Sequence, residues 1–218
     1  MTSNPLKQKK IILGGVILIL GLCLWLLSSP KPPVMPFPGV TILPNPMVIS
    51  EFELISHQGK PYTNEDLKGK WSFMFFGYTH CPDVCPTTLA LLNNFYKKQE
   101  QQDNKNVIFV TADPIRDSVE VMAEQIDYYN KNFTGLTAND VPTIKKLGEE
   151  VGVIFDYETL DHDLIRDYST LTSESEYAVE HNASIFIIDP KGRLVADILP
   201  PHTLERVSKT FSLVEEYY

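Results

Sequence analysis

Residues 71–78, Trp-Ser-Phe-Met-Phe-Phe-Gly-Tyr, form a short apolar run that leads directly into two closely spaced cysteines, Cys81 and Cys85. A run of this kind, rich in aromatic residues, predicts a buried central strand. The only other cysteine is Cys23, so the thiols cannot belong to a broad disulfide framework. The pair is therefore either a redox couple or a metal-binding clip, and both need the two sulfur atoms on the same side of the chain.

Strand and helix patterns alternate through most of the chain after residue 47. Residues 118–130, for example, place Val119, Met122 and Ile126 on one face of a helix. This alternation predicts an α/β sandwich around a mixed central sheet. Residues 156–177 are too polar for a core and predict an inserted loop or small hairpin on the surface. The expected strands are 51–55, 71–78, 107–111, 184–188 and 193–198, and the expected helices are 87–98, 118–130, 141–151 and 204–216.

The N-terminal region carries a continuous apolar run from Ile11 to Leu27, preceded by three lysines. The run is long enough to cross a membrane, and the leucines at its end are unlike the small residues of a signal-peptide cut site. We therefore predict a cytoplasmic segment at 1–10 and an uncleaved, single-pass transmembrane helix at 11–27. The first ten residues do not resemble an Arg-rich mitochondrial presequence, which favours the bacterial inner membrane with the soluble domain in the periplasm.

Residues 28–46 contain seven prolines, a composition that favours an extended, semi-rigid spacer. The remainder, 47–218, has the length of one ordinary domain with a full core. Four of the 19 basic residues precede residue 47 whereas all 28 acidic residues follow it, so the predicted domain has a formal charge of −13. An acidic surface of this kind argues against nucleic acid as a partner.

The prolines around the cysteines predict where the next helix begins. Pro86 disfavours helical geometry at Cys85, so we expect the helix to start near Pro86, with both cysteines at or just before its N-terminus. The partial positive charge of a helix N-terminus lowers the pKa of a nearby thiol and makes a thiolate available for attack or for metal coordination.

Two thiolates leave a soft metal ion incompletely coordinated, so a third ligand is expected among the five histidines. His181 is the best candidate, because it lies just before the apolar strand at 185–188, where a loop can reach back across the edge of the sheet. The other four have simpler local explanations. They lie in a hairpin turn (His57), directly beside the first cysteine (His80), between two aspartates (His162) and near a helix start (His202).

Three segments in this order resemble the Sco/SenC family: Phe-Gly-Tyr-Thr-His-Cys-Pro-Asp-Val-Cys-Pro at 76–86, Val-Thr-Ala-Asp-Pro-Ile-Arg-Asp at 110–117, and residues 177–192. The resemblance covers most of the predicted domain. It implies a thioredoxin-like fold on a membrane tether. It also implies delivery of copper to the binuclear copper site of cytochrome c oxidase subunit II.

By position, the resemblance implies that Cys81, Cys85 and His181 are copper ligands and that Asp113 lies near the site. Two thiolates and an imidazole suit trigonal Cu(I), whereas Cu(II) would need a further ligand. Structural zinc sites generally use four protein ligands, so zinc fits less well. The sequence has Glu180 and Asn182 where the family often has Asp and Ser, which changes the surroundings of the histidine but not the ligand itself.

A competing hypothesis is a thiol-disulfide oxidoreductase on the same scaffold. Cys81 and Cys85 would then cycle between dithiol and disulfide and would reduce the cysteines of a partner before that partner receives metal. The two activities are compatible, because thiols must be reduced before they bind Cu(I).

Overall fold

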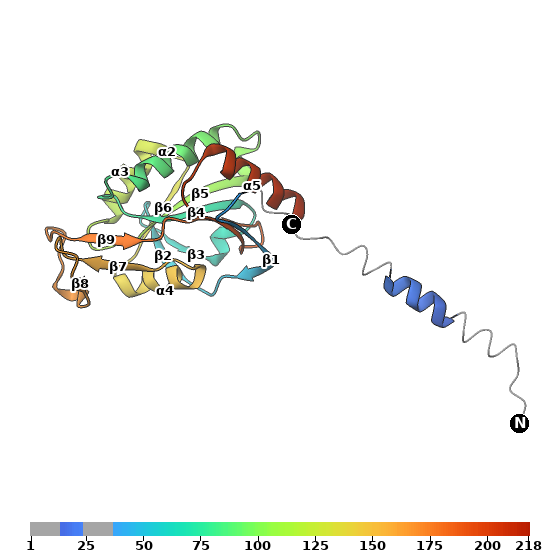
Figure 1. The fold of residues 1–218 in the computed structure, drawn as a ribbon. Helices are drawn as coiled ribbons and strands as arrows, with labels where there is room; N and C mark the ends of the chain where they lie inside the picture. Colours follow the sequence, from blue (N-terminus) through green and yellow to red (C-terminus); the bar gives the residue numbers. More distant parts are fainter. Residues whose placement is uncertain (1–13, 24–36) are drawn as a thin grey trace, which may run out of the picture. The chain divides into compact units, whose positions relative to one another are not determined.

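The computed structural model describes residues 14–23 and 37–218. Within 37–218, eight strands form one mixed sheet in the order β1-β11-β10-β4-β5-β6-β2-β3 (Figure 1). β4, β5 and β6 run parallel, while the other pairings are antiparallel. The strands are β1 (Val40–Val48), β2 (Glu53–Ser56), β3 (Pro61–Thr63), β4 (Trp71–Gly77), β5 (Lys105–Thr111), β6 (Thr134–Thr137), β10 (Ile185–Ile188) and β11 (Arg193–Ile198).

Helices cover both faces of this sheet (Figure 1). α2 (Val84–Lys97), α3 (Val119–Tyr129) and α5 (Leu204–Tyr217) pack on one face, and α4 (Val141–Val151) packs on the other. The predicted α/β sandwich around a mixed sheet is confirmed. Each expected strand and helix within the domain overlaps an observed element, whereas β6 was not expected.

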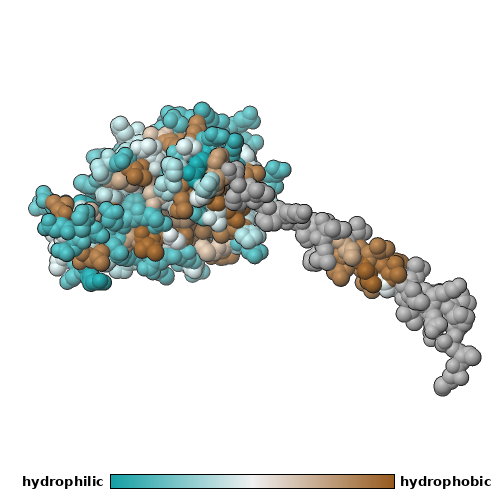
Figure 2. Space-filling view, viewed as in Figure 1, coloured by the Kyte–Doolittle hydropathy of each residue, from teal (hydrophilic) through white to brown (hydrophobic). Residues whose placement is uncertain are grey.

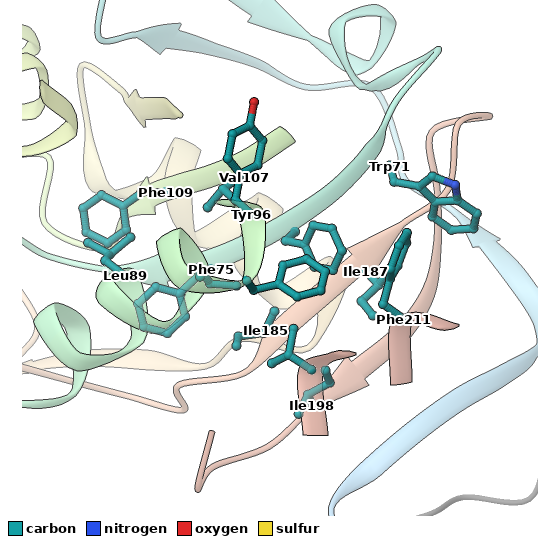
Figure 3. Packing of buried hydrophobic residues seen from close by; sticks show 14 of the residues in the cluster. Trp71, Phe75, Leu89, Tyr96, Val107, Phe109, Ile185, Ile187, Ile198 and Phe211 are labelled. Atoms are coloured by element: carbon teal, nitrogen blue, oxygen red, sulfur yellow. The ribbon is translucent and has the colours of Figure 1, made fainter. Parts of the chain in front are cut away.

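The core has two halves because β4 is buried on both of its faces. Phe73 and Phe75 join the cluster under α2, α3 and α5, while Met74 and Phe76 join the cluster under α4. This is the alternation of side chains expected along a strand. Figure 3 shows part of the first cluster, with Phe75 from β4 among residues of the neighbouring strands and of α5.

The sheet begins inside the segment that the sequence assigned to a proline-rich spacer. β1 is an edge strand that pairs with β11, and its Val40 and Ile42 are buried in the core. The register shifts between Ile42 and Met47, across the prolines at 44 and 46. Proline is tolerated on an edge strand and at such an irregularity because no neighbouring strand needs its missing N–H group.

A second, three-stranded sheet has the order β8-β7-β9. It consists of β7 (Phe155–Glu158), β8 (Leu164–Ile165) and β9 (Ala178–His181). The segment 156–177 was expected to be a surface loop or small hairpin, and β7 and β8 do form a hairpin. It is more firmly attached than a surface loop, since Tyr157 and Tyr177 are buried.

Residues 14–23 form a helix within the predicted transmembrane segment. It is hydrophobic along its length in Figure 2, whereas the face of the domain in view is mostly hydrophilic. Among the residues that the structure describes, no helix is both long and apolar enough to span a membrane. The remainder of the predicted span, 11–13 and 24–27, and the cytoplasmic segment 1–10 lie outside the described residues.

A partly buried histidine, His202, joins the segment after β11 to α2. Its Nε2 lies 3.2 Å from the carbonyl oxygen of Ile198, and its Nδ1 lies 3.1 Å from Oγ1 of Thr88. A carbonyl only accepts, so Nε2 carries the proton and Nδ1 accepts from the hydroxyl of Thr88. Burial lowers the pKa of His202, the hydrogen bond to Ile198 opposes this shift, and the nearby positive charge of Arg206 adds to it, so the fold disfavours the protonated imidazole.

We predict that this histidine makes the domain less stable in acid. Because the folded pKa is depressed, the unfolded chain binds more protons once pH falls below about 6.5. The free energy of unfolding then decreases until pH passes the folded pKa. Urea unfolding between pH 8 and pH 5 should show a smaller loss for His202→Gln than for the wild type. His162→Gln, whose parent side chain is 82% exposed, is the control and should behave as the wild type. Identical pH profiles for the wild type and His202→Gln would contradict the prediction.

Candidate metal or thiol site

The site is built where two parallel strands end. β4 and β5 are neighbours throughout their length, with Gly77 opposite Thr111 at their carboxyl ends. The thiol segment follows β4, and a turn at residues 112–117 follows β5. The backbone N–H group of Ala112 donates to the carbonyl oxygen of Gly77 at 2.6 Å, which holds the two connections together. Ligand and active sites of α/β sheets lie at this edge, beyond the carboxyl ends of the parallel strands.

The helix after β4 begins earlier than the sequence analysis expected. α2 starts at Val84, so Cys85 lies inside its first turn, and only Cys81 precedes the helix. Pro86 is accommodated because the N–H groups of the first turn have no partner within the helix, so its missing donor costs nothing there. Cys85 is completely buried whereas Cys81 is partly exposed.

Glycine is required at residue 77, directly below the second thiol. A Cβ atom there would lie 2.8 Å from Sγ of Cys85 and 2.7 Å from the ring of Phe109. Both distances are too short for a real Cβ contact, and both neighbours are buried. Gly77 therefore leaves room for the sulfur of Cys85 to pack against the end of β4.

The two thiols differ strongly in acidity. A hydrogen bond from the thiol of Cys85, supported by the backbone N–H groups of Asp83 and Cys85 and by His181, lowers the pKa of Cys81 to about 5. The N–H group of Cys85 lies 3.5 Å from Sγ of Cys81. Donation of this hydrogen bond and burial both raise the pKa of Cys85. At neutral pH the site therefore holds an accessible thiolate at Cys81 and a buried thiol at Cys85.

His181 lines the same cleft as Cys81. The cleft has a volume of about 440 Å³ and lies between the thiol segment and β9. Nδ1 of His181 lies 3.2 Å from the carbonyl oxygen of Asn182, which can only accept, so Nδ1 donates and Nε2 keeps its lone pair. The imidazole ring packs edge to face against Tyr78, with 6.1 Å between the ring centroids.

The described residues contain no group of three or more Cys, His, Asp or Glu side chains close enough together to hold a metal ion. Cys81 and Cys85 are neighbours in space, and His181 is near enough to contribute to the lowered pKa of Cys81.

Asp113 is fully buried and does not line the cleft. It contacts two residues that do, Arg116 and Tyr177. Its carboxylate pairs with Nε of Arg116 and accepts a hydrogen bond of 2.7 Å from the hydroxyl of Tyr177. The guanidinium of Arg116 lies against the ring of Tyr177, 3.8 Å from its centroid. Asp113 thus belongs to a three-residue cluster at the base of β9.

Asp117, at the end of the same turn, holds the thiol segment. Its carboxylate accepts hydrogen bonds from the backbone N–H group of Thr79 at 3.0 Å and from the Thr79 hydroxyl at 2.5 Å. The hydroxyl of Thr111 donates a third bond at 2.5 Å. Neither Asp117 nor Arg116 was singled out in the sequence analysis. One signal was available in the sequence. The Arg116-Asp117 pair closely follows a predicted strand, and that strand could lie beside the one that leads to the thiols.

The remaining histidines have local roles. His57 accepts a hydrogen bond from the backbone N–H group of Gly135, and His162 pairs with Glu158 on the surface. His202 is partly buried and does not line the cleft. His80 does line the cleft, but its side chain is 55% exposed and its Nδ1 lies 3.1 Å from the hydroxyl of Thr79.

Comparison with known proteins identifies a family and related structures. Residues 41–214 match the family described as SCO1/SenC. A putative copper-binding protein from Stutzerimonas stutzeri is 30% identical over 173 residues, which cover 78% of each chain. An SCO2-like protein from Rickettsia typhi is 30% identical over 198 residues, covering 89% of this chain and 91% of the relative.

The fold also matches a solved structure from this group, ScoI from Bradyrhizobium japonicum with copper bound. The TM-score is 0.62 at 29% sequence identity, and the match covers 78% of this chain and 99% of the other. The thioredoxin-like α/β fold expected from the sequence resemblance is thereby confirmed.

We predict that the two thiols react very differently with alkylating agents. In the reduced protein, with Cys23→Ser to remove the third thiol, the rate of alkylation at Cys81 should rise through a midpoint near pH 5. The rate at Cys81 should reach its plateau before pH 7, while Cys85 reacts much more slowly. Peptide mass spectrometry identifies the modified cysteine. Cys85→Ala removes the thiol hydrogen bond and should move the midpoint to higher pH; an unchanged midpoint would contradict this origin of the acidity.

Proposed function

The chain belongs to the SCO1/SenC family, and we propose on that premise that it binds copper and delivers it during the assembly of cytochrome c oxidase. The observation that supports the proposal most directly is the acidic thiol of Cys81 in the same cleft as the imidazole of His181. Soft thiolate ligands favour Cu(I) over harder metal ions, and imidazole is a suitable further ligand for copper.

In this proposal Cys81, Cys85 and His181 bind the copper ion, with Nε2 as the donor atom of the imidazole. The hydrogen bond from Nδ1 to the Asn182 carbonyl fixes the tautomer that leaves Nε2 free, an arrangement typical of metal-binding histidines. Cys81 offers a thiolate near neutral pH, whereas Cys85 must first release a proton. Copper binding therefore releases a proton and weakens in acid.

Cargo delivery also requires that the copper can leave. Cys81 is the accessible sulfur and lies on an open cleft, so an incoming ligand can reach a copper ion held there. The acceptor we propose is the binuclear copper site of subunit II. We further propose that residues 11–27 anchor the chain in a bacterial inner membrane, which places the cleft in the periplasm beside a membrane-bound acceptor.

We predict a single tight Cu(I) site per chain. The test is an anaerobic titration of the reduced full-length protein against a chromophoric Cu(I) chelator. Cys81→Ser and Cys85→Ser should abolish tight binding. His181→Ala should weaken it by at least about 10-fold, which is the lower end of what even the loss of a supporting residue costs in metal sites.

His162→Ala is the matched control for the loss of a histidine, because His162 is exposed and distant in sequence from the thiols. It should leave copper affinity unchanged. If the folded, reduced wild type bound no Cu(I) in competition with the chelator, the copper proposal would be wrong.

The asymmetry of the two thiols favours a second candidate function, thiol-disulfide exchange. The Cys81 thiolate would attack a partner disulfide, forming a mixed disulfide and releasing one partner thiolate. The Cys85 sulfur, after losing its proton, would then displace the second partner thiolate and close the Cys81–Cys85 disulfide. The partner gains two electrons and the chain loses two, so each reduced chain reduces a single disulfide.

A kinetic comparison separates the two candidates. With a small aromatic disulfide as substrate, the exchange reaction should require Cys81 and should stop at a trapped mixed disulfide in Cys85→Ser. His181→Ala should leave the exchange largely unaffected while it weakens copper binding. Loss of exchange in His181→Ala to the same extent as in Cys81→Ser would contradict separate roles for the histidine and the thiols.

A further inference from the structure

The turn at residues 112–117 contacts both halves of the site through two adjacent residues. Asp117 holds Thr79, which lies two positions before Cys81, through the two hydrogen bonds described above. Arg116 holds the other half, because its Nη1 donates to the carbonyl oxygen of Tyr177 at 3.1 Å. Tyr177 directly precedes β9, the strand that ends at His181.

The Arg116 side chain is held firmly enough to act as a fixed point. It is only 8% exposed and is paired through Nε with the buried carboxylate of Asp113. Its guanidinium also packs on the ring of Tyr177, whose hydroxyl donates to the same carboxylate. The planar fork of arginine lets one side chain make both polar contacts and the stacking contact, and lysine cannot reproduce this geometry.

The other end of the connection is equally constrained. The Asp117 carboxylate is also bonded by the hydroxyl of Thr111 on β5, and its backbone carbonyl oxygen accepts a 2.8 Å bond from the hydroxyl of Thr137 on β6. The turn is therefore tied to two parallel strands of the main sheet. The small sheet is attached to the same turn, since the Tyr157 hydroxyl donates to the carbonyl oxygen of Ala112 at 2.7 Å.

We propose that Arg116 is a positioning residue that fixes His181 relative to the thiols, and this rests on the proposed copper function. Arg116 touches neither the thiols nor the imidazole in the contacts described here. It holds the start of β9 against the turn at 112–117. The next residue in that turn, Asp117, holds the thiol segment. Without this connection β9 shifts more freely, and bringing His181 to the metal requires a larger loss of conformational freedom.

The first test is a double-mutant cycle on Cu(I) affinity with the reduced full-length protein. Arg116→Lys should weaken binding by about 10-fold or more when His181 is present, the range found for residues that orient metal ligands. In the His181→Ala background it should have no further effect, because there is no imidazole left to position. Equal weakening in both backgrounds, or none in either, would overturn the proposal.

Two further variants guard against a simple folding defect. Tyr177→Phe keeps the buried ring but removes the hydroxyl bond to Asp113, and it should show a smaller weakening that again depends on His181. Arg166→Lys changes an exposed arginine in the hairpin region and should have no effect. A weakening with Tyr177→Phe that persisted in His181→Ala would count against the positioning role.

A metal-free measurement separates this inference from the copper proposal. Amide hydrogen exchange in the reduced apo protein should be faster at residues 178–181 in Arg116→Lys than in the wild type, while the amides of β4 keep their protection. Unchanged exchange at 178–181, or faster exchange throughout the domain, would overturn the positioning role. Absence of Cu(I) binding by the wild type would instead overturn the proposed function and leave the exchange result to decide the role of Arg116.

Discussion

The parallel pairing of β4 with β5 is the constraint on which the rest of the site depends. It brings the thiol segment and the turn at 112–117 to the same edge of the sheet, although more than twenty positions separate them in sequence. The side chains of Asp117 and Arg116 then form hydrogen bonds with the backbone of the segments on either side of the turn. Thr79 is bound on one side and Tyr177 on the other. Hydrogen bonds to charged groups in buried surroundings are stronger than neutral ones, so these contacts fix the geometry more firmly than surface contacts could.

The difference between the two cysteines follows from the same construction. Cys85 lies in the first turn of a helix that packs over β4, and Gly77 leaves space for its sulfur. Cys81 lies three residues before the start of the helix, where the second thiol and backbone N–H groups stabilise its negative charge. A sulfur that is accessible and ionised beside one that is buried and protonated suits both copper binding and thiol exchange. The two proposed functions therefore share one electrostatic arrangement.

The sequence predicted those parts of the fold whose pattern is visible in a short window. Apolar β4 and the amphipathic helices belong to this group, and so does the proximity of the two cysteines. The spacer was placed too far along the chain, because edge strand β1 tolerates prolines that would disrupt an inner strand. The small sheet is polar in sequence and was expected as a loop or small hairpin on the surface. Its burial comes from Tyr157 and Tyr177, which only the tertiary structure brings together. Arg116 and Asp117 gain their roles in the same way, from neighbours distant in sequence.

The division of the site between two sheets has a consequence for how such a protein can change. The thiols lie in the segment after β4 and in the first turn of α2, whereas His181 lies at the end of β9 in a separate three-stranded sheet that also contains the β7–β8 hairpin. Insertions or deletions in that hairpin can alter the placement of the imidazole without disturbing the packing around the cysteines. In the proposed copper function, a change in this hairpin would therefore alter metal affinity through His181 while leaving the dithiol pair itself unchanged.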